Sequence, residues 1–237
     1  MTFFRPSFVN LLTLCLTAMG LLAAAPTSQA ILLVSYDFET TGTGYVDPTS
    51  TGAGVTTASA NAVGGFVRSG TSAPNGTGTA AIQFFNLDQV GLPSGTNASS
   101  DFISFTVSAT TPGQSLDLQS LTFKTNLSAT AAVSALYSVQ YDDLSDGAGN
   151  FVNLALTPST AQTSATVVNR SVDLSGAAFD NLTAGIVFRI NFAKSAASTS
   201  TDSARVDLIE LNGAVVPEPA SGLLLLLGGI PLLRRRR

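Results

Sequence analysis

The sequence has little of the chemistry on which enzymes usually depend. It contains no histidine, no tryptophan and one cysteine, Cys15, among 237 residues. Without histidine the chain lacks the most common general base and the most common zinc ligand. Cys15 lies in an apolar run near the N-terminus, so the rest of the chain can form no disulfide and has no thiolate nucleophile. A glycine-rich phosphate loop, a nucleophile elbow and a metal-ligand cluster are also missing, and we expect neither an enzyme nor a resident cofactor.

Charged side chains are scarce and mostly acidic, making up 11% of the residues. Residues 31–216 contain 14 acidic and 6 basic residues, a net charge of −8, whereas Arg5 and four arginines at the C-terminus lie outside this segment. An acidic domain does not bind nucleic acid by neutralising phosphates. It suits solubility outside the cell, divalent cations, or cationic groups of a matrix.

The N-terminus has the organisation of a secretory signal peptide. Arg5 precedes an apolar run over residues 8–25, and Ser28-Gln29-Ala30 matches a small-x-small cleavage site. We therefore predict that residues 1–30 are removed by signal peptidase after Ala30.

The C-terminus combines three features in a fixed order. Val216-Pro217-Glu218-Pro219 is followed by an apolar run over residues 220–233 and then by Arg234, Arg235, Arg236 and Arg237. The prolines disfavour helix, and the arginines anchor the topology because they remain in the cytoplasm. As a helix, the 14-residue apolar run would span about 21 Å, against a hydrocarbon core of about 30 Å. Such a short transmembrane segment suits temporary insertion better than permanent anchoring.

This order of features resembles the PEP-CTERM sorting tail of Gram-negative bacteria that produce exopolysaccharide. The resemblance implies recognition by an exosortase, with a cut at or near Pro217-Glu218-Pro219. It also implies an intermediate tethered to the inner membrane, which then passes to the cell surface or extracellular matrix. The alternative is an ordinary tail anchor that contains Pro-Glu-Pro by chance.

Between these ends, the alternation of apolar and polar residues predicts an all-β domain over residues 31–213. In residues 185–194, Ile186, Phe188, Ile190 and Phe192 share one face; residues 133–141, 103–109 and 32–38 alternate similarly. Such alternation predicts a sheet with one buried and one solvated face. Further strands are expected over residues 80–87, 116–125, 151–156, 163–174 and 204–212. About nine strands indicate an antiparallel two-sheet β-sandwich of the jelly-roll type.

Departures from the regular pattern predict local features of this sandwich. The phase of alternation slips between Leu118 and Leu121 and between Leu208 and Ile209, which predicts two β-bulges. Residues 40–79, rich in Thr, Ser, Gly and Ala, are expected to form loops with one or two short strands. Residues 213–216 are expected to be a linker, so that residues 214–237 form the sorting tail.

Two groups of acidic residues are candidate calcium ligands. Asp37 and Glu39 lie on the outward face of the first strand, and Asp207 would lie nearby if the first and last strands pair. These carboxylates could bind calcium; alternatively, Arg205 forms an exposed salt bridge with one of them. Residues 142–150 begin with Asp142-Asp143 but lack the ligand spacing of an EF-hand loop, and Asp-Gly and Gly-Asn within them favour a plain hairpin turn.

Sugar binding has little aromatic support, because Tyr45 is the only tyrosine in an expected loop. We predict an exported, non-catalytic protein with a structural or interaction role in exopolysaccharide or biofilm. A carbohydrate- or calcium-binding module is the first alternative, and a secreted glycoside hydrolase, which would need two facing carboxylates, is the second.

Overall fold

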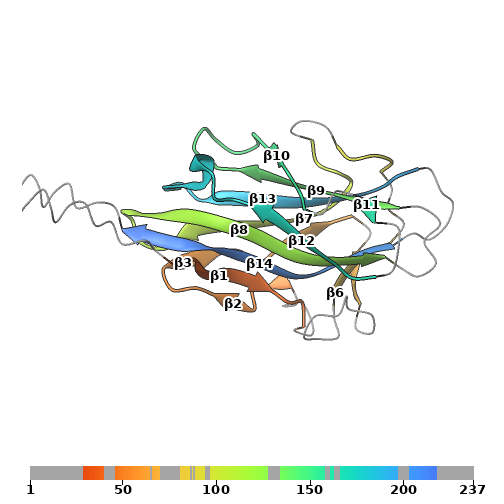
Figure 1. Cartoon of the computed structure of the whole chain (residues 1–237), viewed down its shortest axis with the longest axis horizontal. Helices are drawn as coiled ribbons and strands as arrows, with labels where there is room; N and C mark the ends of the chain where they lie inside the picture. The colour runs from red at the N-terminus through yellow and green to blue at the C-terminus, as the bar shows by residue number, and fades with distance from the viewer. Residues whose placement is uncertain are drawn as a thin grey trace, which may run out of the picture.

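Two antiparallel sheets packed face to face form the fold in this computed structural model (Figure 1). The structure describes residues 29–39, 46–64, 66–69, 81–85, 87, 89–93, 97–127, 134–157, 161–162, 166–196 and 203–217. Sheet A contains β1 (Ile31–Tyr36), β2 (Ser50–Thr51), β5 (Phe66–Ser69), β6 (Ala81–Phe85), β8 (Gln114–Leu127), β12 (Val168–Asp173) and β14 (Ser203–Pro217). Sheet B contains β3 (Val55–Thr57), β4 (Asn61–Val63), β7 (Asp101–Ala109), β9 (Ala135–Asp142), β10 (Val152–Leu154), β11 (Ala161–Gln162) and β13 (Ile186–Lys194). The predicted two-sheet β-sandwich is confirmed.

The described residues hold more strands than expected. Fourteen strands replace the predicted nine, and four of them, β2 to β5, lie in the stretch 40–79 where one or two were expected. These four are only two to four residues long, and they pair at the margins of longer strands, β3 and β4 both with β7. No single one has enough residues to show an alternating pattern, so the sequence could not reveal them.

Helical structure is minimal in the described part of the chain. A 3-10 turn, η2 (Ala177–Phe179), connects β12 to β13 and buries Phe179 against the core. No helix among these residues is long and apolar enough to cross a membrane. The predicted apolar segments 8–25 and 220–233 lie outside the described residues.

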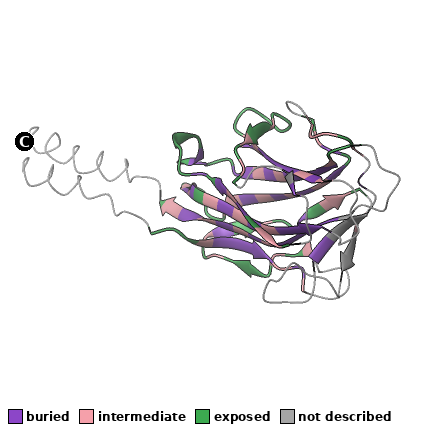
Figure 2. Ribbon diagram, turned by 45° about the vertical axis from the view of Figure 1, so that its right-hand side comes forward, coloured by how far each residue is buried: buried purple, intermediate pink, exposed green. Residues whose placement is uncertain are grey.

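The core lies between the sheets and follows the predicted alternation where the longest strands meet. Phe188 and Ile190 of β13 are fully buried, as is Ile103 of β7. Figure 2 shows the buried residues concentrated on the strands and the exposed ones on the loops. The rings of Tyr36 in sheet A and Phe105 in sheet B lie 5.3 Å apart, so this pair joins the two layers. Burying one large apolar side chain contributes about 1.5–3 kcal/mol.

The prediction of one solvated face is wrong for part of sheet B. Ser138 and Gln140 of β9 point away from the core, yet both are buried. The segment that precedes β7 covers them, because the side-chain amide of Gln140 donates to the carbonyl of Asn97 at 3.1 Å. Sheet B therefore has a covered polar layer on its outer side.

The first strand also departs from the simple pattern. Its register against β14 shifts between Leu32 and Val34, and Leu33 is fully buried although Leu32 was expected in the core. Phe38 follows the strand in a left-handed conformation with φ of 58° and still reaches the core. A bulge and a turn thus replace the uninterrupted alternation predicted for residues 32–38.

Candidate functional site

Strand β14 is central to sheet A, and its neighbour on one side changes along its length. Residues 203–206 pair with β6, whereas Ile209 to Gly213 pair with β1. Between these two stretches the register against β8 shifts, and Leu208 adopts a left-handed φ of 48°. The β-bulge predicted at Leu208 and Ile209 is therefore confirmed. So is the other predicted bulge, because β8 leaves Gln119 unpaired between Leu118 and Ser120.

Asp207 lies at this change of neighbour and is almost completely buried, with 2% exposure. The pKa of its carboxyl group is raised to about 7, chiefly by burial and to a smaller extent by the charges of Glu39 and Asp37. The backbone N–H of Leu208, which donates to Asp207 Oδ1 at 2.7 Å, and the ammonium group of Lys124 act in the opposite direction. Near neutral pH this carboxyl group is thus divided between its charged and neutral forms.

The structure brings the three predicted calcium ligands into one neighbourhood. Asp37 is fixed by its own hydrogen bonds, since Asp37 Oδ1 accepts from the hydroxyl of Thr49 at 2.6 Å and from the N–H of Glu39 at 3.0 Å. Both acidic side chains act on the charge of Asp207. Within the described residues, however, their oxygen atoms do not converge within 4.8 Å. Calcium binding by Asp37, Glu39 and Asp207 stays a prediction, as does the alternative ion pair of Arg205.

A shallow hollow of about 280 Å³ opens over sheet A next to Asp207. Three adjacent strands line it: β8 with Thr122, Phe123 and Lys124, β12 with Asn169, Arg170 and Ser171, and β14 with Leu208 and Glu210. The side chains of Phe123 and Arg170 are buried, whereas Asn169 is exposed and Lys124 and Glu210 are half-buried. The accessible lining is therefore mixed, with a larger apolar than polar share.

The loop after β9 is a hairpin turn, as predicted, because β9 and β10 pair antiparallel around it. Asp142 organises it, with Oδ1 accepting from the N–H of Leu144 at 3.1 Å and Oδ2 from the N–H of Gly149 at 2.6 Å. In this stretch, whose sequence favours a turn over a calcium loop, Asp142, Asp143 and Asp146 place carboxylate oxygens within 4.8 Å of one another. Such a group could hold a cation, but backbone N–H groups already satisfy both oxygens of Asp142.

The polar layer of sheet B was missed because its residues come from distant segments. Asn191 of β13 donates to Gln140 at 3.1 Å and accepts from the N–H of Ser99 at 3.0 Å. Arg189 lies over the ring of Phe151, 3.5 Å from its centroid, and its pKa is lowered by burial. An arginine stacked on a ring and buried amides that hydrogen-bond one another form a rigid polar layer.

A second polar network lies inside the sandwich and was also missed. The guanidinium group of Arg170 donates from Nε to Thr125 Oγ1 at 2.8 Å and lies 4.3 Å from the ring centroid of Tyr137. Arg170 is 1% exposed, and burial lowers its pKa. Gln162, also buried, accepts from Thr125 at 2.7 Å. Arg170 shares the alternation phase of the buried residues Val172 and Leu174, but arginine is so rarely buried that this phase alone does not predict its burial.

The predicted processing residues are only partly within the described chain. Ala30 precedes β1 directly and is exposed. Val216 and Pro217 are the last residues of β14, where they pair with Ser115 and Gln114 of β8. The predicted linker over residues 213–216 is therefore wrong, since these residues continue the sheet. Outside the described residues lie Glu218, Pro219, the four arginines at 234–237 and Tyr45.

Comparisons with known proteins add no assignment. No protein-family model matches the chain, and no curated protein matches it. Among solved structures, the chain is similar to the CBM22-1 xylan-binding domain of Paenibacillus barcinonensis Xyn10C, with 14% identity, coverage of 79% of this chain and 97% of that chain, and a TM-score of 0.44. The mannan-recognising module TmCBM27 is 10% identical, the match covers 79% of this chain and 99% of that chain, and the TM-score is 0.40. The K1 cleaved adhesin domain of Lys-gingipain from Porphyromonas gingivalis W83 is 16% identical, the match covers 78% of this chain and 98% of that chain, and the TM-score is 0.35. Likenesses this distant assign no ligand or activity.

Proposed function

We propose that this chain is an exported β-sandwich protein that an exosortase sorts and processes for the cell surface or extracellular matrix of a Gram-negative bacterium. One observation supports this proposal above the others. The sandwich begins at Ile31, directly after the predicted signal-peptidase site at Ala30, and its last strand ends at Pro217 within the predicted sorting motif. The first and last described strands thus lie next to the two predicted cleavage sites.

The sequence beyond the domain suits temporary tethering. Two residues of the Pro-Glu-Pro motif, Glu218 and Pro219, separate β14 from the apolar run over residues 220–233. That run is shorter than the hydrocarbon core, and the arginines after it oppose translocation. A domain attached this closely would leave the membrane only after cleavage.

The proposed role of the exported domain is non-catalytic and concerns structure or interaction in exopolysaccharide or biofilm. Support comes from the mature chain, which would contain neither histidine nor cysteine. Asp207, the carboxyl group with a pKa raised into the neutral range, lies buried at a strand junction. Because structural networks also shift pKa values, the raised pKa of Asp207 is compatible with a non-catalytic role.

Mass spectrometry of the exported protein tests the sorting proposal. The full chain is produced in a Gram-negative host with an exosortase, and the protein is recovered from the medium and the envelope. We expect an N-terminus at Ile31, a C-terminus at or near Pro217-Glu218-Pro219, and no terminal arginines. Replacing the three motif residues by alanine should leave the longer form in the membrane. Asn153→Ala, on the exposed edge strand β10, is the matched control and should mature normally.

Recovery of extracellular protein that still carries Arg234 to Arg237 would contradict the proposal. Normal maturation of the alanine variant would do the same and would favour an ordinary tail anchor. Release of reducing sugar from polysaccharide by the purified protein would instead favour the glycoside hydrolase alternative.

A further inference from the structure

The hollow over sheet A is a surface feature that the structural role does not use. We propose that this hollow binds a short segment of a neutral polysaccharide through Lys124, Asn169, Ser171 and Glu210. This inference gives the exported domain a ligand, and it does not depend on whether an exosortase processes the tail.

The backbone itself creates the hollow. An extended antiparallel sheet presents a nearly flat face, but β14 carries one extra residue against β8 between Asp207 and Glu210. The left-handed φ of Leu208, 48°, changes the direction of the strand locally, and Leu208 is one of the residues that line the hollow. The hollow is therefore preformed, and ligand binding would not require the sheet to rearrange.

The lining groups match the chemistry of sugar hydroxyls. Glu210 accepts hydrogen bonds and Lys124 donates them, while the amide of Asn169 and the hydroxyl of Ser171 can do both. Charged groups make stronger hydrogen bonds than neutral ones. Leu208 adds an apolar patch that suits the C–H face of a sugar ring. At about 280 Å³ the hollow is slightly smaller than most ligand sites, which span roughly 300–1,000 Å³, so it would accommodate only a short segment.

The charges around the hollow favour a neutral ligand over an acidic one. Glu210 lies in the hollow itself. Asp207 directly precedes the lining residue Leu208. The charges of Glu39 and Asp37 raise the pKa of Asp207. Of the two cationic side chains in the lining, Arg170 is buried and Lys124 is half-buried. Uronate or sulfate groups would meet net repulsion from these carboxylates and from a domain of net charge −8.

Affinity electrophoresis of the full chain tests the inference. The protein is purified in a polyoxyethylene detergent, which carries no sugar headgroup, and run through native gels that contain β-glucan, galactomannan, arabinoxylan or alginate. We expect at least one neutral polysaccharide to retard the wild-type protein, and alginate to have no effect. Glu210→Gln and Asn169→Ala should each weaken binding at least tenfold, whereas Asn153→Ala on sheet B should bind as the wild type does.

Three results would overturn the inference. They are no retardation by any neutral polysaccharide, binding as strong as that of the wild type by both hollow variants, or stronger retardation by alginate than by the neutral polysaccharides. Asn169 is exposed, so its truncation should leave the melting temperature unchanged and keep the test interpretable. Glu210→Gln preserves size and shape and serves as the second variant. Failure of sugar binding with normal maturation would refute the hollow alone, whereas failed maturation with retained binding would refute the sorting proposal alone.

Discussion

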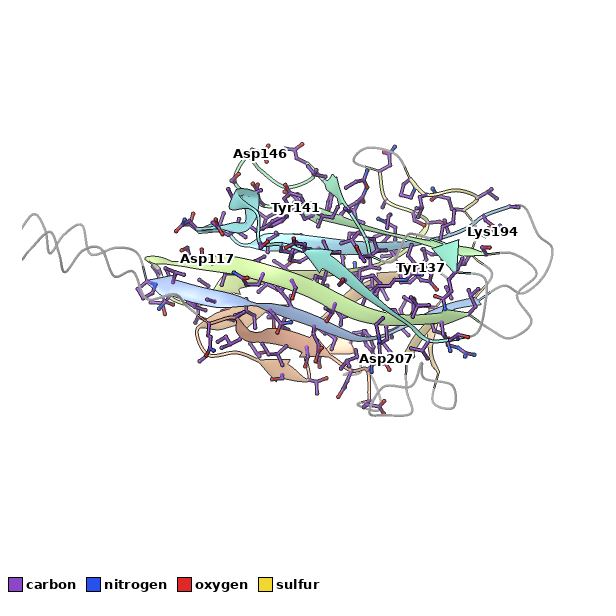
Figure 3. All side chains as sticks on the ribbon, in the orientation of Figure 1. Asp117, Tyr137, Tyr141, Asp146, Lys194 and Asp207 are labelled. Atoms are coloured by element: carbon purple, nitrogen blue, oxygen red, sulfur yellow. The ribbon has the colours of Figure 1, made fainter. Side chains whose placement is uncertain are left out.

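Ile31 lies opposite Gly213 in the ladder between β1 and β14. The first residue after the predicted signal-peptide cleavage and the strand that leads into the predicted sorting motif are therefore neighbours at one end of the sandwich (Figure 1). Asp117 lies at that end and Lys194 lies at the opposite one (Figure 3). During export both membrane-directed segments would thus leave from the same side. The hollow lies on the face of sheet A, between β8, β12 and β14. A membrane attachment through the end of β14 would therefore leave the hollow accessible to a ligand.

Gly213→Ala should destabilise the protein by about 1–3 kcal/mol. A Cβ atom at Gly213 would lie 2.4 Å from the carbonyl oxygen of Asp117 and 3.0 Å from Leu118 Cα. Both are backbone atoms of the paired strand β8, so relief would require separating two central strands. Urea denaturation measures the loss in free energy of unfolding.

Gly176→Ala is the matched control for this prediction. Its φ is −82°, and a Cβ atom there would meet nothing within 4 Å. Equal stability of the two variants would show that the close approach of β14 and β8 at Gly213 is not a real constraint.

Asp207→Asn should stabilise the protein at pH 8 and have much less effect at pH 4. The folded state raises the pKa of Asp207 to about 7 from 3.8, so it binds a proton more readily than the unfolded chain does. This group therefore supports folding fully below about pH 3.8, and that contribution is lost as the pH rises to about 7. The amide can still accept from the N–H of Leu208. The expected gain at pH 8 is on the order of 2–4 kcal/mol.

Urea denaturation of the wild type and Asp207→Asn between pH 4 and pH 8 measures this effect. The two free energies of unfolding should diverge as pH rises. Asp173→Asn is the control of opposite sign, because hydrogen bonds from Ser175 lower the pKa of Asp173. Its carboxylate supports folding above its unfolded pKa, so this variant should not gain stability at pH 8. Parallel pH profiles for the wild type and Asp207→Asn would contradict the assignment.

Arg170→Ala should cost about 1–3 kcal/mol, the range expected when a buried hydrogen-bonding group loses its partner. The change leaves Thr125 Oγ1 without its guanidinium partner and opens a space beside Tyr137. Arg170→Lys should rescue little, because an ammonium group cannot reproduce the planar contact with the ring. Thermal unfolding of both variants measures the loss. Arg205 of β14 is half-buried, so Arg205→Ala should cost less stability than Arg170→Ala or Arg170→Lys. A larger loss of stability for Arg205→Ala would contradict this ranking.

The residues that sequence analysis placed correctly are those whose own pattern decides their environment. Alternation in β13 identified Phe188 and Ile190 as core residues, and breaks in alternation located both bulges. Such features depend on neighbours within one strand. The period of two in a strand makes any extra residue visible as a change of phase.

The errors arose where a distant segment determined the environment. Gln140 looks solvent-facing in its own strand, but the segment carrying Asn97 covers it. Arg170 is a residue type that is rarely buried, and only the meeting of β8, β11 and β12 encloses it. Residues 213–216 were expected to be a linker, yet β14 extends to Pro217 because the start of β8, at Gln114, lies directly opposite. The hollow follows from three strands together, so no local pattern could predict it.

Calcium tests the remaining hypothesis about the acidic residues near Asp207. If Asp37, Glu39 and Asp207 bind calcium, millimolar calcium should raise the melting temperature at pH 8 by several degrees, since a ligand that binds only the folded state stabilises it. The rise should be smaller at pH 6, where calcium must displace the proton of Asp207, whose pKa is about 7.

The double variant Asp37→Asn with Asp207→Asn should abolish this rise. The matched control is Asp143→Asn with Asp146→Asn, which removes the same number of charges from the loop after β9. If that control abolishes the rise and the first variant retains it, calcium binds the hairpin loop and the hypothesis for Asp207 is wrong. Because magnesium at equal ionic strength screens charge as strongly but prefers a smaller octahedral site, an equal rise with magnesium would assign the effect to general screening of an acidic domain.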